Sequence, residues 1–148
     1  MEDTEDNRRS HLTQIQLVVI RMAANSFLLK GWAVTLVAAL FALASVDSRQ
    51  EFAYLALLPA ITFWGLDAYY LRQERLFREL YKGVWSTSPG SLKDIFSMDT
   101  KPYESKVHSL WATIRTPTLS AFHGAIVVAV VIGIIVLSIH GGGQSPRP

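Results

Sequence analysis

The chain of 148 residues has no cysteine, and three long stretches of it carry almost no charge. The missing cysteine excludes disulfides, thiolate metal sites and a thiol nucleophile. The 14 basic and 12 acidic residues leave a net charge of only +2, an excess too small to indicate a nucleic-acid binder. A soluble core would spread its apolar residues periodically along the chain. The uncharged stretches therefore exclude an ordinary water-soluble enzyme and indicate a multipass membrane protein.

Catalytic and metal-binding motifs are absent as well. The sequence contains no HExxH, GxSxG, GxxxxGK[ST] or GxGxxG pattern and no Cys/His metal spacing. The four histidines are far apart along the chain, at His11, His108, His123 and His140. We therefore expect no catalytic residue, no metal site and no cofactor.

Three segments are long and apolar enough to cross a membrane. A helix that spans a hydrocarbon core of about 30 Å needs roughly 20 mainly apolar residues. Residues 27–46, 52–71 and 119–139 satisfy this criterion, and their ionisable residues, tyrosines aside, are Lys30, Asp67 and His123. Pro59 removes one backbone hydrogen bond from the second span and predicts a kink there. Only residues 47–51 join the first two spans, so these must form an antiparallel hairpin.

The distribution of basic residues predicts the orientation. Residues 72–118 carry eight basic side chains, and the segment before the first span adds Arg8, Arg9 and Arg21. By the positive-inside rule, both regions face the cytoplasm, and the third span leaves residues 140–148 outside. A cleaved secretory signal is the competing interpretation, because Ala42-Leu43-Ala44 resembles a cleavage site. The long, acidic segment before the first span argues against it.

Helical periodicity continues beyond the membrane on the cytoplasmic side. It predicts an amphipathic helix from about Asn7 into the first span, where Leu12, Ile15, Val19 and Met22 recur at helical spacing. It also predicts an extension of the second helix as far as Trp85, with an i,i+4 pair of Glu74 and Arg78 and an apolar stripe at Leu76, Phe77, Leu80, Tyr81 and Val84. Ser91 and Asp94 resemble a capping box for a short helix at residues 92–96, and a further amphipathic helix follows Pro102. The sequence thus predicts an all-α integral membrane protein. Its parts are a cytoplasmic helix at 1–26, a transmembrane hairpin at 27–71, a cytoplasmic helical region at 72–118, a third span at 119–139 and a disordered tail at 140–148.

Lys30 and Asp67 form the most informative pair. Lys30 precedes Arg49 in the hairpin loop by 19 residues and Asp67 follows it by 18, so an antiparallel hairpin places them at the same depth. His123 enters the third span at a similar depth. An ionisable group inside a span is a candidate functional site unless it is paired for structure alone. The sequence leaves both roles open, as it does a pH-dependent role for His123.

Two further sets of residues are candidates for contacts. Small residues recur every fourth position on one face of the third span, at Ala121, Ala125, Ala129 and Gly133. That spacing lets helices approach closely and fits either packing on the chain's own hairpin or self-association. Basic residues follow the second span at Arg72, Arg75, Arg78 and Lys82, where they are expected to contact anionic lipid or a partner.

The phrases RMAANSFLLKGWAVTLVAALFALA and FWGLDAYYLRQERLFRELYKGV resemble a group of small, mostly uncharacterised bacterial multipass membrane proteins. This likeness covers roughly residues 21–84. The hairpin followed by a cytoplasmic helical region is similar in architecture to the SLATT-type two-span effectors of bacterial defence systems, from which the third span departs. That resemblance implies an oligomeric pore in the inner membrane.

Two functions follow as expectations. The first is a non-enzymatic, homo-oligomeric effector or channel-like protein of the inner membrane, which changes permeability when a cytoplasmic protein partner or anionic signal molecule acts on it. The second is a membrane anchor or assembly subunit whose cytoplasmic helices dock a soluble partner, with Phe77, Tyr81 and Trp111 as the expected contact residues. Both need the lipid bilayer, and neither involves nucleic acid.

Overall fold

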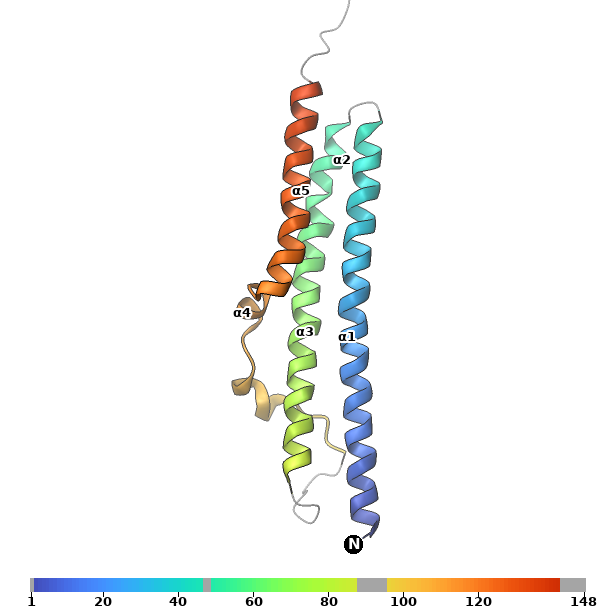
Figure 1. The fold of residues 1–148 in the computed structure, drawn as a ribbon, viewed down its shortest axis with the longest axis vertical. Coiled ribbons are helices and arrows are strands. Elements are labelled where there is room, and N and C mark those ends of the chain that lie inside the picture. The colour runs from blue at the N-terminus through green and yellow to red at the C-terminus, as the bar shows by residue number, and fades with distance from the viewer. Residues whose placement is uncertain (1, 47–48, 88–95, 142–148) are drawn as a thin grey trace, which may run out of the picture. The chain divides into compact units, whose positions relative to one another are not determined.

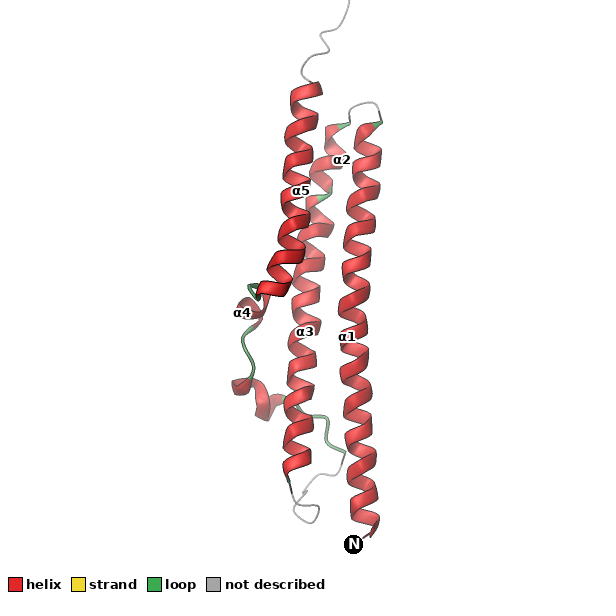
Figure 2. Ribbon diagram, in the orientation of Figure 1, coloured by secondary structure: helices red, strands yellow, loops and turns green. Residues whose placement is uncertain are grey.

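The computed structural model describes residues 2–46, 49–87 and 96–141. Within these ranges the chain forms helices joined by irregular segments, and it contains no strand. The helices are α1 (Glu2–Ser45), α2 (Gln50–Leu55), α3 (Leu57–Ser86), a 3₁₀ helix (Lys101–Lys106), α4 (Leu110–Ile114) and α5 (Pro117–Gly141) (Figures 1 and 2). The predicted fold class is confirmed at this level. Three helical stretches are long and apolar enough to span a membrane, at Thr4–Ser45, Gln50–Ser86 and Pro117–Ile139.

The chain forms two compact units, each built from segments that are far apart in sequence. Unit 1 combines Met1–Ser26 with Ala68–Thr113, and unit 2 combines Phe27–Asp67 with Ile114–Pro148. Only 17%, 28% and 11% of the three most apolar windows are buried. Because exposed apolar side chains at this density have no stable place in water, this finding agrees with helices that lie in a membrane.

Unit 1 has its own apolar core. Leu12 and Ile15 of α1 pack with Leu80 and Val84 of α3, as the helical spacing in both segments predicts. The partly buried side chains around this core are Phe77, Tyr81, Met98 and Tyr103. The i,i+4 pair of Glu74 and Arg78, expected from the sequence, is present with a separation of 2.6 Å.

Unit 2 packs through small side chains. Its core joins Val37 of α1, Ala56 between α2 and α3, Ala60 of α3 and Val130 of α5, and α2 packs against α5 (Figure 1). Gln50 adds a hydrogen bond from Nε2 to the carbonyl oxygen of Leu137, 3.2 Å away. Alanine at these positions lets helix backbones approach closely, which is how helices associate without water to drive them together.

The second span is one helical stretch, Gln50–Ser86, with a local defect near its start. The sequence predicts one helix from residue 52 to 85 with a kink at Pro59, and the structure divides it at Ala56 into α2 and α3. Pro59 explains the break, because it cannot donate to the carbonyl of Leu55 and its ring crowds that group. Ala56 itself keeps a helical backbone, with φ −63° and ψ −21°, and its N–H donates to the carbonyl of Phe52. The defect predicted at Pro59 is therefore a missing hydrogen bond to the carbonyl of Leu55, one turn before the proline.

Several predicted boundaries were wrong. Helix α1 begins at Glu2 rather than near Asn7 and ends at Ser45, one residue before the predicted end of the span. The hairpin loop is shorter than 47–51, because Gln50 and Glu51 belong to α2. Helix α5 runs from Pro117 to Gly141, so it begins two residues before the predicted third span and includes the first two residues of the predicted tail. The predicted capped turn at 92–96 and the rest of the tail fall mostly outside the described residues.

The helix predicted after Pro102 is not continuous. It is replaced by the 3₁₀ helix, an extended residue Val107 with φ −119° and ψ 140°, and the short helix α4. Ser109 ends the extended stretch, because its Oγ accepts the backbone N–H of Ala112 at 3.3 Å as an N-cap does. Pro117 is the first residue of α5, a position that proline favours. The third span therefore belongs to a new helix that begins at Pro117.

Candidate functional site

A cluster of three ionisable side chains lies inside unit 2, and we call Lys30, Asp67 and His123 the Asp67 cluster. The Oδ2 atom of Asp67 lies 2.6 Å from Nζ of Lys30 and 2.9 Å from Nε2 of His123. Helices α1, α3 and α5 each supply one member. The structure thus brings together the three residues that the sequence places at one depth of the spans.

Burial differs among the three members. The side chains of Asp67 and His123 are completely buried, whereas that of Lys30 is 27% exposed. A buried carboxylate needs charged or hydrogen-bonding partners to offset its lost hydration. Lys30 supplies the charge, and its long stem keeps part of the side chain at the surface of the unit, as lysine does at apolar boundaries.

The hydrogen bond to Asp67 fixes the tautomer of His123. With Asp67 ionised, its carboxylate only accepts hydrogen bonds, and Nε2 of His123 carries the hydrogen and donates it. In the neutral ring, Nδ1 is then an acceptor. This atom is buried and has no hydrogen-bond partner within the described part of the chain. With a neutral imidazole, the cluster holds one positive and one negative charge and an unused proton acceptor.

Aromatic rings enclose the histidine. Trp64 stacks on His123 with ring centroids 6.0 Å apart and an angle of 11°, and Phe122 meets it edge-on at 5.1 Å. Trp64 is in turn held by a hydrogen bond from Nε1 to the carbonyl oxygen of Ile114, 3.2 Å away. Trp64 was not among the residues predicted for this site. Its position three residues before Asp67, on the same face of α3, is the signal that identifies it.

The small residues of the third span divide into two groups. Ala121, Ala125 and Ala129 are exposed, so they do not pack on the hairpin of their own unit. Gly133 does pack there, because a Cβ added to it would overlap the ring of Phe41. The face of α5 that packs inside unit 2 instead contains His123, Ile126, Val127 and Val130. Three of the four predicted small residues therefore remain open to another helix.

The basic residues after the second span have different surroundings. Arg72 donates from Nε to the carbonyl of His108 at 3.3 Å, which ties α3 to the segment before α4. Arg75 is partly buried. Arg78 and Lys82 line a groove and pair with glutamates of their own helix at 2.6 Å. The four cations thus do not form one uniform patch.

In the described ranges no group of three or more histidine, aspartate or glutamate side chains is placed to hold a metal ion. The chemistry that the Asp67 cluster offers is charge and proton binding inside an apolar unit.

Comparison of the chain with family models, with curated proteins and with solved structures returned no match.

Proposed function

We propose that this protein is a non-enzymatic, channel-like membrane protein, which works as a homo-oligomer of the inner membrane and changes its permeability in response to a cytoplasmic signal. The observation that carries the proposal is the Asp67 cluster. A carboxylate that is completely buried within a candidate span holds a lysine and a histidine, and the histidine keeps an unpartnered nitrogen within the described part of the chain. Intramembrane ionisable groups are rare and mark ion or proton pathways in many membrane proteins.

The unpartnered nitrogen distinguishes this cluster from a purely structural ion pair. Buried polar atoms are almost always hydrogen-bonded, and an exception needs an explanation such as an ion, a water molecule or a functional role. A leucine or phenylalanine at position 123 would pack between the aromatic rings without leaving an unpaired group. An imidazole whose Nδ1 faces no partner suits a site that takes up a proton or a water molecule transiently. In our proposal, the cluster lies at the cytoplasmic mouth of the path.

A homo-oligomer is part of the proposal because three helices cannot enclose a water-filled path alone. The exposed face formed by Ala121, Ala125 and Ala129 offers a surface for close contact with a second copy. We propose the orientation that the basic residues favour, with the N-terminus in the cytoplasm and the C-terminus outside.

The test in cells is the membrane potential during induced expression. We expect the wild-type protein to depolarise cells and Asp67→Asn to reduce the depolarisation at least fivefold. A fivefold change corresponds to a free-energy difference of about 1 kcal/mol. Glu51→Gln is the matched control, because it removes one carboxylate charge at an exposed position of α2. Unchanged potential in cells that express the wild-type protein in their membrane would contradict the proposal.

The oligomer has its own test. Ala125→Leu adds bulk to the exposed face of α5 without disturbing the packing inside unit 2, so we expect the mass of the detergent-solubilised protein to fall toward that of a monomer. Val131→Leu is the control, because Val131 is also exposed on α5 but lies about 120° around the helix from Ala125, and it is expected to leave the mass unchanged. Light scattering corrected for bound detergent measures both. A wild-type protein that is already monomeric would speak against a pore.

The second candidate function, a membrane anchor for a soluble partner, is favoured by one observation. Trp111 is 69% exposed in unit 1, although tryptophan is a common anchor residue at protein interfaces. Phe77 and Tyr81, which the sequence also suggests for docking, instead pack against the core of unit 1. A partner that co-purifies with the wild-type protein and is lost in Trp111→Glu would favour this function. Recovery of the protein alone would count against it.

A further inference from the structure

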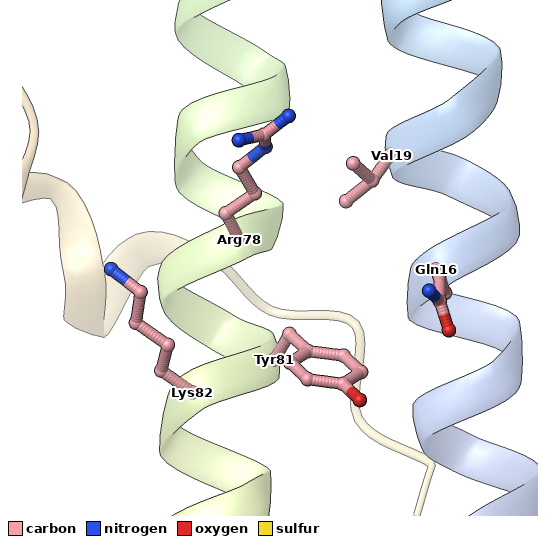
Figure 3. A pocket seen from close by; sticks show the side chains of 5 residues that line it. All are labelled: Gln16, Val19, Arg78, Tyr81 and Lys82. Atoms are coloured by element: carbon pink, nitrogen blue, oxygen red, sulfur yellow. The ribbon is translucent and has the colours of Figure 1, made fainter.

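A groove in unit 1 is lined by two exposed cationic residues and the ring of a tyrosine. It is not part of the proposed ion path. It has a volume of about 430 Å³ and is lined by Gln16, Val19, Arg78, Tyr81 and Lys82. Figure 3 shows the Arg78 and Tyr81 side chains extending from α3 toward α1, where Val19 and Gln16 lie, whereas the Lys82 side chain extends away from α1. A second hollow of about 360 Å³ adjoins it and shares Tyr81 and Lys82.

The groove presents positive charge outward. Arg78 pairs with Glu74 and Lys82 pairs with Glu79, and in each pair the cation is the exposed partner. The side chains of Arg78 and Lys82 are 62% and 70% exposed, against 11% and 23% for Glu74 and Glu79. Exposed ion pairs contribute little, so an anionic ligand in the groove can recruit the guanidinium of Arg78 at small cost. The guanidinium of Arg78 keeps further N–H donors beyond the bond to Glu74.

The position of these cations along α3 favours a soluble anion over a lipid headgroup. The predicted apolar span ends at Leu71. At about 1.5 Å per residue, Arg75 lies about 6 Å beyond that point, Arg78 about 10 Å and Lys82 about 16 Å. The headgroup layer is only about 5–7 Å thick on each side of the hydrocarbon core. Arg72 and Arg75 therefore suit the lipid surface, whereas Arg78 and Lys82 lie beyond it.

The aromatic residues define the second part of the ligand. The ring of Tyr81 stacks with that of Trp85 at a centroid distance of 6.5 Å and an angle of 6°. Trp85 is 61% exposed, so part of this flat apolar surface is open beside Lys82. A flat ring packs well on such a surface. A phosphate group accepts paired hydrogen bonds from an arginine fork.

We propose that the groove binds a soluble phosphate ester that carries an aromatic ring. Arg78 donates to the phosphate and Tyr81 supports the ring. The role of this ligand as the cytoplasmic signal rests on the proposed function, whereas its binding does not. Binding is therefore measured separately from membrane permeability, and either one can fail alone.

The experiment is calorimetry on the full chain in nanodiscs of uncharged lipid, with phenyl phosphate as the probe. A ligand of this size is expected to bind with a Kd of about 0.1–3 mM. We expect Arg78→Gln to weaken binding at least tenfold, because it removes hydrogen bonds to a charged group, whose typical strength corresponds to about that factor. Tyr81→Leu should abolish the preference for phenyl phosphate over inorganic phosphate. Arg75→Gln, the matched control on the same helix, should change neither value.

Three results would overturn the proposal. The first is the absence of saturable binding at concentrations several times the weakest expected Kd. The second is an equal loss in Arg75→Gln and Arg78→Gln, which would indicate unspecific attraction to the basic surface. The third is loss of phenyl phosphate binding in nanodiscs that contain phosphatidylglycerol, which would show that a lipid headgroup occupies the groove. The proposal expects the affinity to be the same in both kinds of nanodisc.

Discussion

Asp67→Leu is expected to destabilise the protein by about 3–5 kcal/mol, the usual cost of removing one partner from a buried ion pair. The substitution leaves the ammonium of Lys30 and the Nε2–H of His123 without the carboxylate oxygen that both now contact. Unfolding in mixed micelles, followed by the loss of helical circular dichroism, measures the change in the free energy of unfolding.

The double variant Lys30→Met with Asp67→Leu is the control for this prediction. It removes both charges, and apolar replacements of a buried ion pair are often neutral or stabilising. We therefore expect it to recover most of the stability that Asp67→Leu loses. A cost below about 1 kcal/mol for Asp67→Leu, the value of an exposed ion pair, would contradict the burial of the cluster.

Gly133→Leu is expected to cost about 1–3 kcal/mol, the usual effect of overpacking. Even a Cβ at this position would overlap the ring of Phe41, which lies against the core of unit 2. Phe41→Ala in the same chain removes the obstructing ring and should recover part of the loss. The same micelle unfolding experiment measures all of these variants.

Gly124→Ala provides the matched control on the same helix. A Cβ at Gly124 meets nothing within 4 Å, so alanine there should leave stability unchanged or raise it slightly, since it favours the helix. Gly133→Ala is the matched comparison, and equal effects of Gly124→Ala and Gly133→Ala would show that Gly133 does not contact Phe41 as described.

The sequence predicted the helical class and the three candidate spans because the underlying signals are strong and local. Long uncharged stretches of this length are typical of membrane-spanning helices, and the spacing of Leu12, Ile15, Leu80 and Val84 identified the face that forms the core of unit 1. The common depth of Lys30 and Asp67 followed from counting residues through a short loop. Their contact at 2.6 Å needed the structure, because residue counting gives depth but not which way a helix faces.

Predictions failed or stayed open where tertiary packing determines the helix boundaries and contacts. The periodicity after Pro102 favoured one helix, but Ser109 and Pro117 divide the segment into short pieces. The small residues of the third span fitted two kinds of contact equally well, and only the structure shows that Ala125 is exposed while Gly133 meets Phe41. The groove around Tyr81 combines residues of α1 and α3 that are far apart in sequence, so no local pattern indicated it.

The most direct measurement of the proposed function is ion flux through liposomes that contain only the purified protein. We expect vesicles with the wild-type protein to leak protons or potassium ions faster than protein-free vesicles. We expect Asp67→Asn to alter this leak and Glu51→Gln to leave it unchanged. Purified protein removes any contribution from a soluble partner, so the same experiment separates the channel from the anchor. Vesicles that stay as tight as protein-free ones, although they hold the folded oligomer, would contradict the account.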